Sequence, residues 1–152
     1  MLKNKKMIAK VLLSLFIPFV FIQSLFFKFT DAPETQHIFG TLDEWAAGFG
    51  FEGLFVPPGI FNAYVIGSAE LAASVLLLAG LFLKRAFLTG FGALMALGIM
   101  SGAISFHLFT PLGVNVQGDG GTLFTMAVGV WVSAVVLVLM HRESLLGVLK
   151  KR

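Results

Sequence analysis

Four long apolar stretches, separated by shorter polar segments, dominate the pattern of hydrophobic and polar positions along the 152 residues. They predict membrane-spanning helices at about residues 8–29, 61–83, 86–109 and 122–140, because about 20 apolar residues in a helix cross the hydrocarbon core of a bilayer. Residues 30–60 and 110–121 form longer loops, and only a tight turn joins the second and third spans. The expected fold is therefore all-α, an integral membrane four-helix bundle that forms a single domain over residues 1–152.

The first long loop carries a helical pattern of its own. Four apolar residues recur there three or four positions apart: Ile38, Leu42, Trp45 and Phe49. Thr41 and Glu44 also match the capping box that stabilises a helix N-terminus. We therefore expect an interfacial helix within residues 30–60.

Charge gives the orientation. The chain is 57% hydrophobic and only 12% charged, which lies far from the usual composition of soluble proteins. Ten of the eleven basic residues sit at the N-terminus, at the turn between the second and third spans, or at the C-terminus. Because cytoplasmic loops retain Lys and Arg, this pattern predicts that both termini are cytoplasmic and that the loops 30–60 and 110–121 are on the outer side.

The basic residues also indicate which partners to expect. They flank apolar spans and form no stripe on a folded face, so membrane lipids are the expected partners and nucleic acid is not. The absence of cysteine excludes thiol–disulfide exchange, iron–sulfur ligation and thiolate catalysis.

Glu70 is the outstanding candidate for chemistry, because it lies near the middle of the second span, where an ionisable side chain is costly and usually turned inward. Ala63, Gly67 and Ser74 share its helical face, so Glu70 is expected to point between helices. It would act as a proton-accepting or ligand-anchoring carboxyl, or as a neutral acid that joins helices. Lys28 is expected at the outer headgroups or paired with Asp31, too far in depth to meet Glu70.

Other polar residues are predicted in the outer half of the spans, where they indicate a small cavity open to the outer side: Gln23, Ser101, Ser105, His107 and Asp119. His107 would shuttle a proton, bind a metal or sit at the headgroup interface. Only His37 could join it as a second outer histidine, so no metal site is predicted. Asp119 lies in Gly118-Asp-Gly-Gly121 and can cap the fourth span. Gly67, Gly98 and Gly102 are predicted helix-packing positions.

The order of these motifs resembles the DoxX-like family of small bacterial membrane proteins: Gly67-Ser-Ala-Glu70-Leu, Ser101-Gly-Ala-Ile-Ser-Phe-His107-Leu and Gln117-Gly-Asp-Gly-Gly121. The resemblance implies a four-helix bundle in the bacterial cytoplasmic (inner) membrane. It also implies association with quinone-linked thiosulfate oxidation or other membrane redox systems. Glu70, His107 and Asp119 match the positions that line the family's polar centre.

Three functional hypotheses remain. The first is an accessory or assembly subunit of a larger membrane complex, or a homo-oligomer, that uses the small-residue face of the third span. The second is a binder of quinone or another lipid-like molecule, anchored by Glu70, with quinone as the candidate cofactor. The third is a proton-coupled transporter. Without a visible haem-ligand pair or flavin fingerprint, the chain is not expected to be an enzyme on its own.

Overall fold

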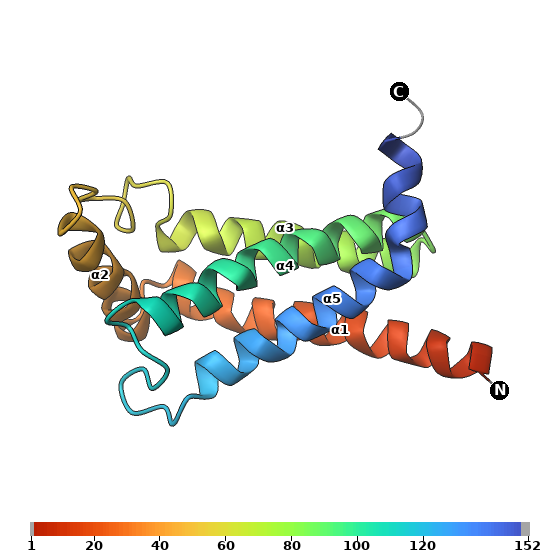
Figure 1. Cartoon of the computed structure of the whole chain (residues 1–152), viewed down its shortest axis with the longest axis horizontal. Helices are drawn as coiled ribbons and strands as arrows, with labels where there is room; N and C mark the ends of the chain where they lie inside the picture. The colour runs from red at the N-terminus through yellow and green to blue at the C-terminus, as the bar shows by residue number, and fades with distance from the viewer. Residues whose placement is uncertain (1, 150–152) are drawn as a thin grey trace.

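The computed structural model describes the backbone of residues 2–149 and the side chains of residues 4–147. Within that range the chain forms five helices and no strands: α1 (Leu2–Phe29), α2 (Pro33–Ala47), α3 (Ala63–Phe82), α4 (Ala86–Phe109) and α5 (Thr122–Leu149). Four of them run along the long axis of the molecule and α2 lies across one end (Figure 1). The all-α prediction is confirmed, and the expected loop helix is present as α2.

Four helices are long and apolar enough to cross a membrane: Asn4–Phe29, Ala63–Phe82, Ala86–Phe109 and Thr122–Gly147. Large aromatic side chains on their outer surfaces support this conclusion, since Phe26, Phe82 and Phe109 are each at least 70% exposed. A soluble bundle would bury such residues, whereas lipid solvates them. The molecule is therefore a multi-pass membrane protein.

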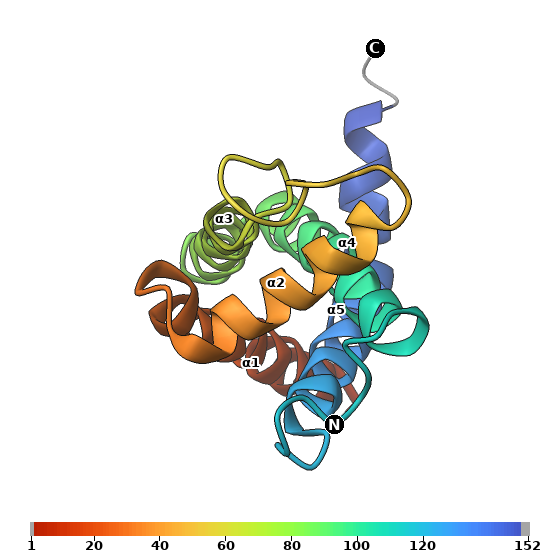
Figure 2. The ribbon, with the colours of Figure 1, turned by 90° about the vertical axis from the view of Figure 1, so that its left-hand side faces the viewer.

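The bundle closes as a ring, in which α1 packs on α3, α3 on α4, α4 on α5, and α5 on α1 (Figure 2). Its core combines bulky residues such as Ile17, Phe21 and Leu77 with several fully or almost fully buried alanines. The alanines let helix backbones approach closely, which is how packing is achieved where lipid removes the hydrophobic drive.

The two ends of the bundle differ. The termini and the α3–α4 turn lie at one end, which we call the terminal end, and α2 with the loops 48–62 and 110–121 forms the other, the α2 end (Figure 1). A second apolar cluster at the α2 end joins α2 to both loops through Leu42, Phe55 and Leu112. This packing ties α2 to the protein.

Helix boundaries differ from the sequence prediction in three places, and the first is α1, which begins at Leu2 and not near residue 8. The capping box was wrong, because α2 begins at Pro33 and Thr41 and Glu44 lie inside the helix. Proline at a first helical turn loses no hydrogen bond, so it starts a helix without a side-chain cap. The fourth span was predicted to end near residue 140, but α5 continues without a break to Leu149, and its last turns bend away from the bundle axis (Figure 1). The basic residues 150–152 lie outside the residues that the structure describes.

Candidate functional site

The most unusual feature of the bundle is an ion pair between α1 and α3. Lys28 Nζ lies 3.0 Å from Glu70 Oε2, with 16% of the Lys28 side chain and 4% of the Glu70 side chain exposed. Ser24 Oγ lies 2.8 Å from the same carboxylate oxygen and accepts a hydrogen bond from Lys28 Nζ at 3.0 Å. We call these three residues the ion-pair cluster. The acid that the sequence singled out is therefore compensated by a lysine and a hydroxyl of the same chain.

This pairing corrects the expectation that Lys28 lies too far in depth to meet Glu70. Helical side chains tilt toward the helix N-terminus, and α1 runs from the terminal end to the α2 end. The Lys28 side chain therefore extends back toward the middle of the bundle. Because a helix rises only roughly 1.5 Å per residue, the long lysine stem spans much of the difference in depth between Lys28 and Glu70. Ser24, one helical turn before Lys28, completes the contact.

Close approach of α1 and α3 makes the pair possible. A Cβ atom added to Gly67 would lie 2.8 Å from Phe29 Cε1, so any side chain at this position would displace the Phe29 ring from its observed place. Phe29 also stacks on Tyr64, with ring centroids 6.4 Å apart. On α3, Tyr64 and Gly67 lie between Glu70 and the α2 end.

His107 and Asp119 belong to a separate polar region. His107, at the end of α4, is buried, and its Nδ1 lies 2.6 Å from the carbonyl oxygen of Gly113. Asp119 accepts hydrogen bonds from the backbone N–H groups of Val116, Gly121 and Leu123. This is the capping role that the sequence predicted.

The capping bonds lower the pKa of Asp119 below 3.8, with the largest effect from the Leu123 N–H and a smaller electrostatic contribution from His107. Asp43 on α2 accepts backbone hydrogen bonds in the same way from the loop 48–62. Its carboxylate accepts from the N–H groups of Phe55 and Gly53, and the Phe55 bond is the main cause of its lowered pKa. Both loops at the α2 end are thus held by carboxylates.

The remaining predicted site residues do not join Glu70. Gln23, Ser101 and Ser105 are exposed on the outer surface of the bundle. Ser101 and Ser105 donate to carbonyls one turn earlier in α4, and Trp131 Nε1 of α5 donates to Ser101 Oγ at 3.0 Å. The predicted concentration of polar groups is therefore divided between the ion-pair cluster, the loop around His107 and the lipid-facing surface.

The glycines on α4 face two ways. A Cβ added to Gly92 would lie 3.0 Å from atoms of α3, whereas nothing lies within 4 Å of a Cβ added to Gly98 or Gly102. Gly98 and Gly102, with the exposed Ser101 and Ser105, thus form a strip that the described residues leave largely uncovered, apart from the Trp131 side chain at Ser101. We call these four residues the α4 face.

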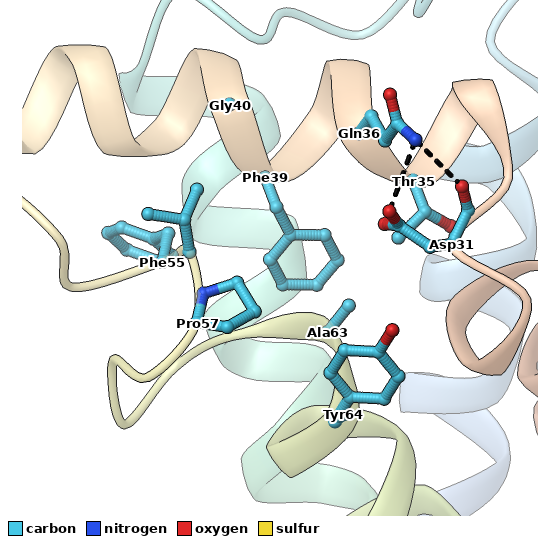
Figure 3. Close-up of a pocket in the computed structure, with 10 residues that line it drawn as sticks. Asp31, Thr35, Gln36, Phe39, Gly40, Phe55, Pro57, Ala63 and Tyr64 are labelled. Carbon is cyan, nitrogen blue, oxygen red and sulfur yellow. Dashed lines mark hydrogen bonds between the residues drawn. The ribbon is translucent and has the colours of Figure 1, made fainter.

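A cavity of about 200 Å³ lies at the α2 end, between α2, the start of α3 and the loop that joins them (Figure 3). None of the residues that were predicted to form a cavity lines it, including Glu70, His107 and Gln23. The lining residues include both polar and aromatic side chains: Asp31, Thr35, Gln36, Phe39, Phe55 and Tyr64. Gln36 Nε2 donates to the Asp31 carboxylate at 3.1 Å and to its backbone carbonyl at 3.0 Å.

The sequence contained a signal for one of these features. Ser24 and Lys28 are spaced four residues apart, so they share a face of α1, and a lysine inside the end of an apolar span needs a partner. The cavity had no such signal, since its residues come from the α1–α2 turn, from α2, from the loop after α2 and from α3. Among the described residues no three His, Cys, Asp or Glu side chains cluster as metal ligands.

Comparison with known proteins gives one finding. Residues 9–110, well over half of the chain, match the family model described as DoxX. Neither the curated proteins nor the solved structures give a match.

Proposed function

The chain belongs to the DoxX family, and on this premise we propose that it is an accessory or assembly subunit that packs against a larger membrane protein complex. One observation carries the proposal. The α4 face (Gly98, Ser101, Gly102 and Ser105) is open to the surroundings of the bundle, and a Cβ added to Gly98 or Gly102 would meet nothing within 4 Å.

Small and hydroxylated residues in a membrane helix are typical of helix–helix contacts, because they let a second backbone approach and offer hydrogen bonds across the interface. Elsewhere in this chain glycines serve that purpose internally, as Gly92 does against α3. Among the described residues, Gly98 and Gly102 on the α4 face have no such neighbour, and Ser101 is contacted only by the Trp131 side chain of α5. A helix of a partner protein fits this face better than lipid tails do.

The ion-pair cluster supports the same proposal indirectly. A buried acid without a partner would require an external ligand or cation, but Glu70 already has Lys28 and Ser24 within 3.0 Å. The pair therefore joins α1 to α3 without help from a substrate. A redox complex in the cytoplasmic membrane is the partner that the family resemblance suggests.

The proposal is tested by native mass spectrometry of the protein extracted from its own membranes in mild detergent. Gly98→Leu is the informative variant, because the space around Gly98 lets the monomer accommodate the larger side chain. Ala72→Leu is the matched control, since Ala72 is exposed on α3 and receives the same side chain. We expect discrete protein partners with the wild-type chain and with Ala72→Leu, and their loss with Gly98→Leu.

Two results would contradict the proposal: a wild-type chain that carries no protein partner, or a Gly98→Leu variant that keeps its partners as well as Ala72→Leu does. Thermal unfolding of both variants controls for stability. A Gly98→Leu chain that unfolds at the temperature of the wild type has lost association alone.

A second candidate, the binding of quinone or another lipid-like molecule, is favoured by one detail. Within the described residues Glu70 Oε1 accepts no hydrogen bond, since Ser24 and Lys28 both contact Oε2. That oxygen can therefore accept a hydrogen bond from a hydroxyl group such as that of a quinol. The same mass spectra test this candidate, which predicts a quinone-sized or lipid-sized mass that is lost in Glu70→Gln and retained in Gly98→Leu.

We also propose that the protein lies in the bacterial cytoplasmic membrane with both termini in the cytoplasm. The basic doublet Lys84 and Arg85 lies at the same end as the termini (Figure 1). Acidic residues are concentrated at the α2 end. This distribution supports the orientation, because positive residues are retained on the cytoplasmic side.

A further inference from the structure

We propose that the cavity at the α2 end binds an organic ammonium group, either the headgroup of a lipid such as phosphatidylethanolamine or a small free amine. The inference is independent of the proposed function. It depends on an acid beside the cavity, on the aromatic residues that line it and on the charge around it (Figure 3).

Asp31 supplies the charge. Its carboxylate oxygen Oδ2 accepts a hydrogen bond from Gln36 Nε2 at 3.1 Å, and both residues are exposed. Its other oxygen, Oδ1, accepts no hydrogen bond from the described residues. Among those residues, no basic side chain has a nitrogen within 4.0 Å of either carboxylate oxygen. Lys28, the nearest basic residue in sequence, is engaged with Glu70. The Asp31 carboxylate therefore lacks a cationic partner.

Aromatic rings supply the second part of the site. Phe39 from α2, Phe55 from the loop and Tyr64 from α3 all line the cavity (Figure 3). Aromatic rings attract ammonium groups, and a lining that combines such rings with the Asp31 carboxylate suits an organic cation better than an anion or a bare metal ion. Thr35 adds a hydroxyl to the same lining.

The charge of the surroundings agrees with a cationic ligand. Six of the eight acidic residues lie at the α2 end, and Lys28 is the only lysine or arginine there among the residues that the structure describes. Since Lys28 is paired with Glu70, the surface around the cavity carries excess negative charge and attracts cations.

Size and position narrow the ligand class. A cavity of about 200 Å³ is smaller than the roughly 300–1,000 Å³ typical of sites for drug-sized molecules, so an amine with a few carbon atoms fits better. The cavity lies where α1 ends at Phe29 and α3 begins at Ala63. These helix ends are expected at the level of the lipid headgroups, where an ethanolamine group is found.

The test uses the full chain and two probes. In the first arm, protein in nanodiscs that contain phosphatidylethanolamine and phosphatidylglycerol is transferred to mild detergent, and native mass spectrometry counts the retained lipids. In the second arm, protein in an uncharged maltoside detergent is titrated with ethanolamine by calorimetry, and sodium chloride serves as the ionic-strength control.

Three variants are compared in both arms. Asp31→Asn removes the charge and is expected to weaken binding about tenfold, as for loss of one charge-assisted hydrogen bond. Phe39→Leu keeps an apolar side chain, removes the ring, and is expected to weaken binding about threefold. Glu34→Gln removes a neighbouring charge from α2 outside the cavity, and binding is expected to change less than about twofold, as for an exposed charge.

Retention of phosphatidylethanolamine alone identifies the ligand as a headgroup, and saturable binding of ethanolamine identifies it as a free amine. The proposal is overturned if neither probe binds the wild type specifically. It is also overturned if Asp31→Asn and Phe39→Leu both bind as Glu34→Gln does.

Discussion

Replacement of Lys28 by methionine is the sharpest test of the ion-pair cluster. The change keeps an apolar stem of similar length but leaves the Glu70 carboxylate, 4% exposed, without its cation. At the observed 3.0 Å separation the attraction between the two charges is about 5 kcal/mol for an effective dielectric constant of about 20. Desolvation offsets part of it, and removal of one partner of a buried pair typically costs about 3–5 kcal/mol. We expect Lys28→Met to destabilise the bundle by about that amount.

Glu70→Gln is expected to cost less. The amide oxygen can still accept hydrogen bonds from Ser24 and Lys28, and the lysine, whose side chain is 16% exposed, can turn its ammonium toward the headgroups. The double variant removes both charges. Its free energy of unfolding is expected to lie within about 1 kcal/mol of that of the Glu70→Gln chain, because a neutral pair leaves no buried charge behind.

The assay is unfolding in mixed detergent micelles, followed by circular dichroism at several fractions of denaturing detergent. Four chains, the wild type, both single variants and the double variant, form a double-mutant cycle. A coupling free energy of about 2 kcal/mol or more is expected for a partly buried pair of this kind. Additive effects, with coupling below about 0.5 kcal/mol, would refute the inference that Lys28 compensates Glu70.

Three other predictions concern packing, pH and orientation. Gly67→Leu should lower the free energy of unfolding by about 1–3 kcal/mol, because even its Cβ would lie 2.8 Å from Phe29. Gly98→Leu should leave stability unchanged, since nothing lies within 4 Å of a Cβ at that position. Equal melting temperatures of the two variants would refute this difference. Asp119 has a lowered pKa, so its stabilisation of the 110–121 loop is present above pH 3.8 and is lost as pH falls through the folded-state pKa. Hydrogen exchange at the Leu123 amide should therefore be faster in Asp119→Asn than in the wild type at neutral pH, and the difference should shrink below pH 3.8. Alkaline phosphatase fused after residue 152 should be inactive and a fluorescent protein there should fluoresce, whereas an active phosphatase would place the C-terminus outside.

Much of the fold could be predicted from the sequence, because each membrane span is a local signal. Runs of apolar residues locate α1, α3, α4 and α5, and helical spacing in the first loop indicates α2. The start of α2 was harder to predict. Thr41 and Glu44 had the right spacing for a cap, but Pro33 begins the helix two turns earlier and the apolar cluster around Leu42 holds it.

The candidate site could be predicted only in part, because partners come from different helices. The position of Glu70 inside an apolar span indicated burial and a need for compensation, and both are present in the structure. Its partner was missed because depth was judged from Cα positions, while the long Lys28 side chain reaches back toward the middle of the bundle. The sequence gives no distance between α1 and α3, so the contact depended on tertiary packing.

The glycines illustrate the same limit. Gly67 and Gly98 both occupy the small-residue spacing that predicts helix packing, yet Gly67 lies against α1, whereas a Cβ added to Gly98 would meet none of the described residues within 4 Å. Sequence spacing shows that one face of a helix carries small residues. Only the arrangement of helices shows whether that face is already covered, and this difference is what directs attention to the α4 face.

The central claim, that the α4 face contacts another protein, is tested most directly by photo-crosslinking in native membranes. A benzophenone-bearing residue is introduced in place of Leu94, one turn before Gly98 on α4, or in place of Leu71 on α3. The two leucines are 45% and 42% exposed, so chemistry and accessibility are matched. We predict a discrete, heavier crosslinked product from position 94 and only uncrosslinked chain from position 71. No protein product from position 94, or equal products from both positions, would contradict the claim.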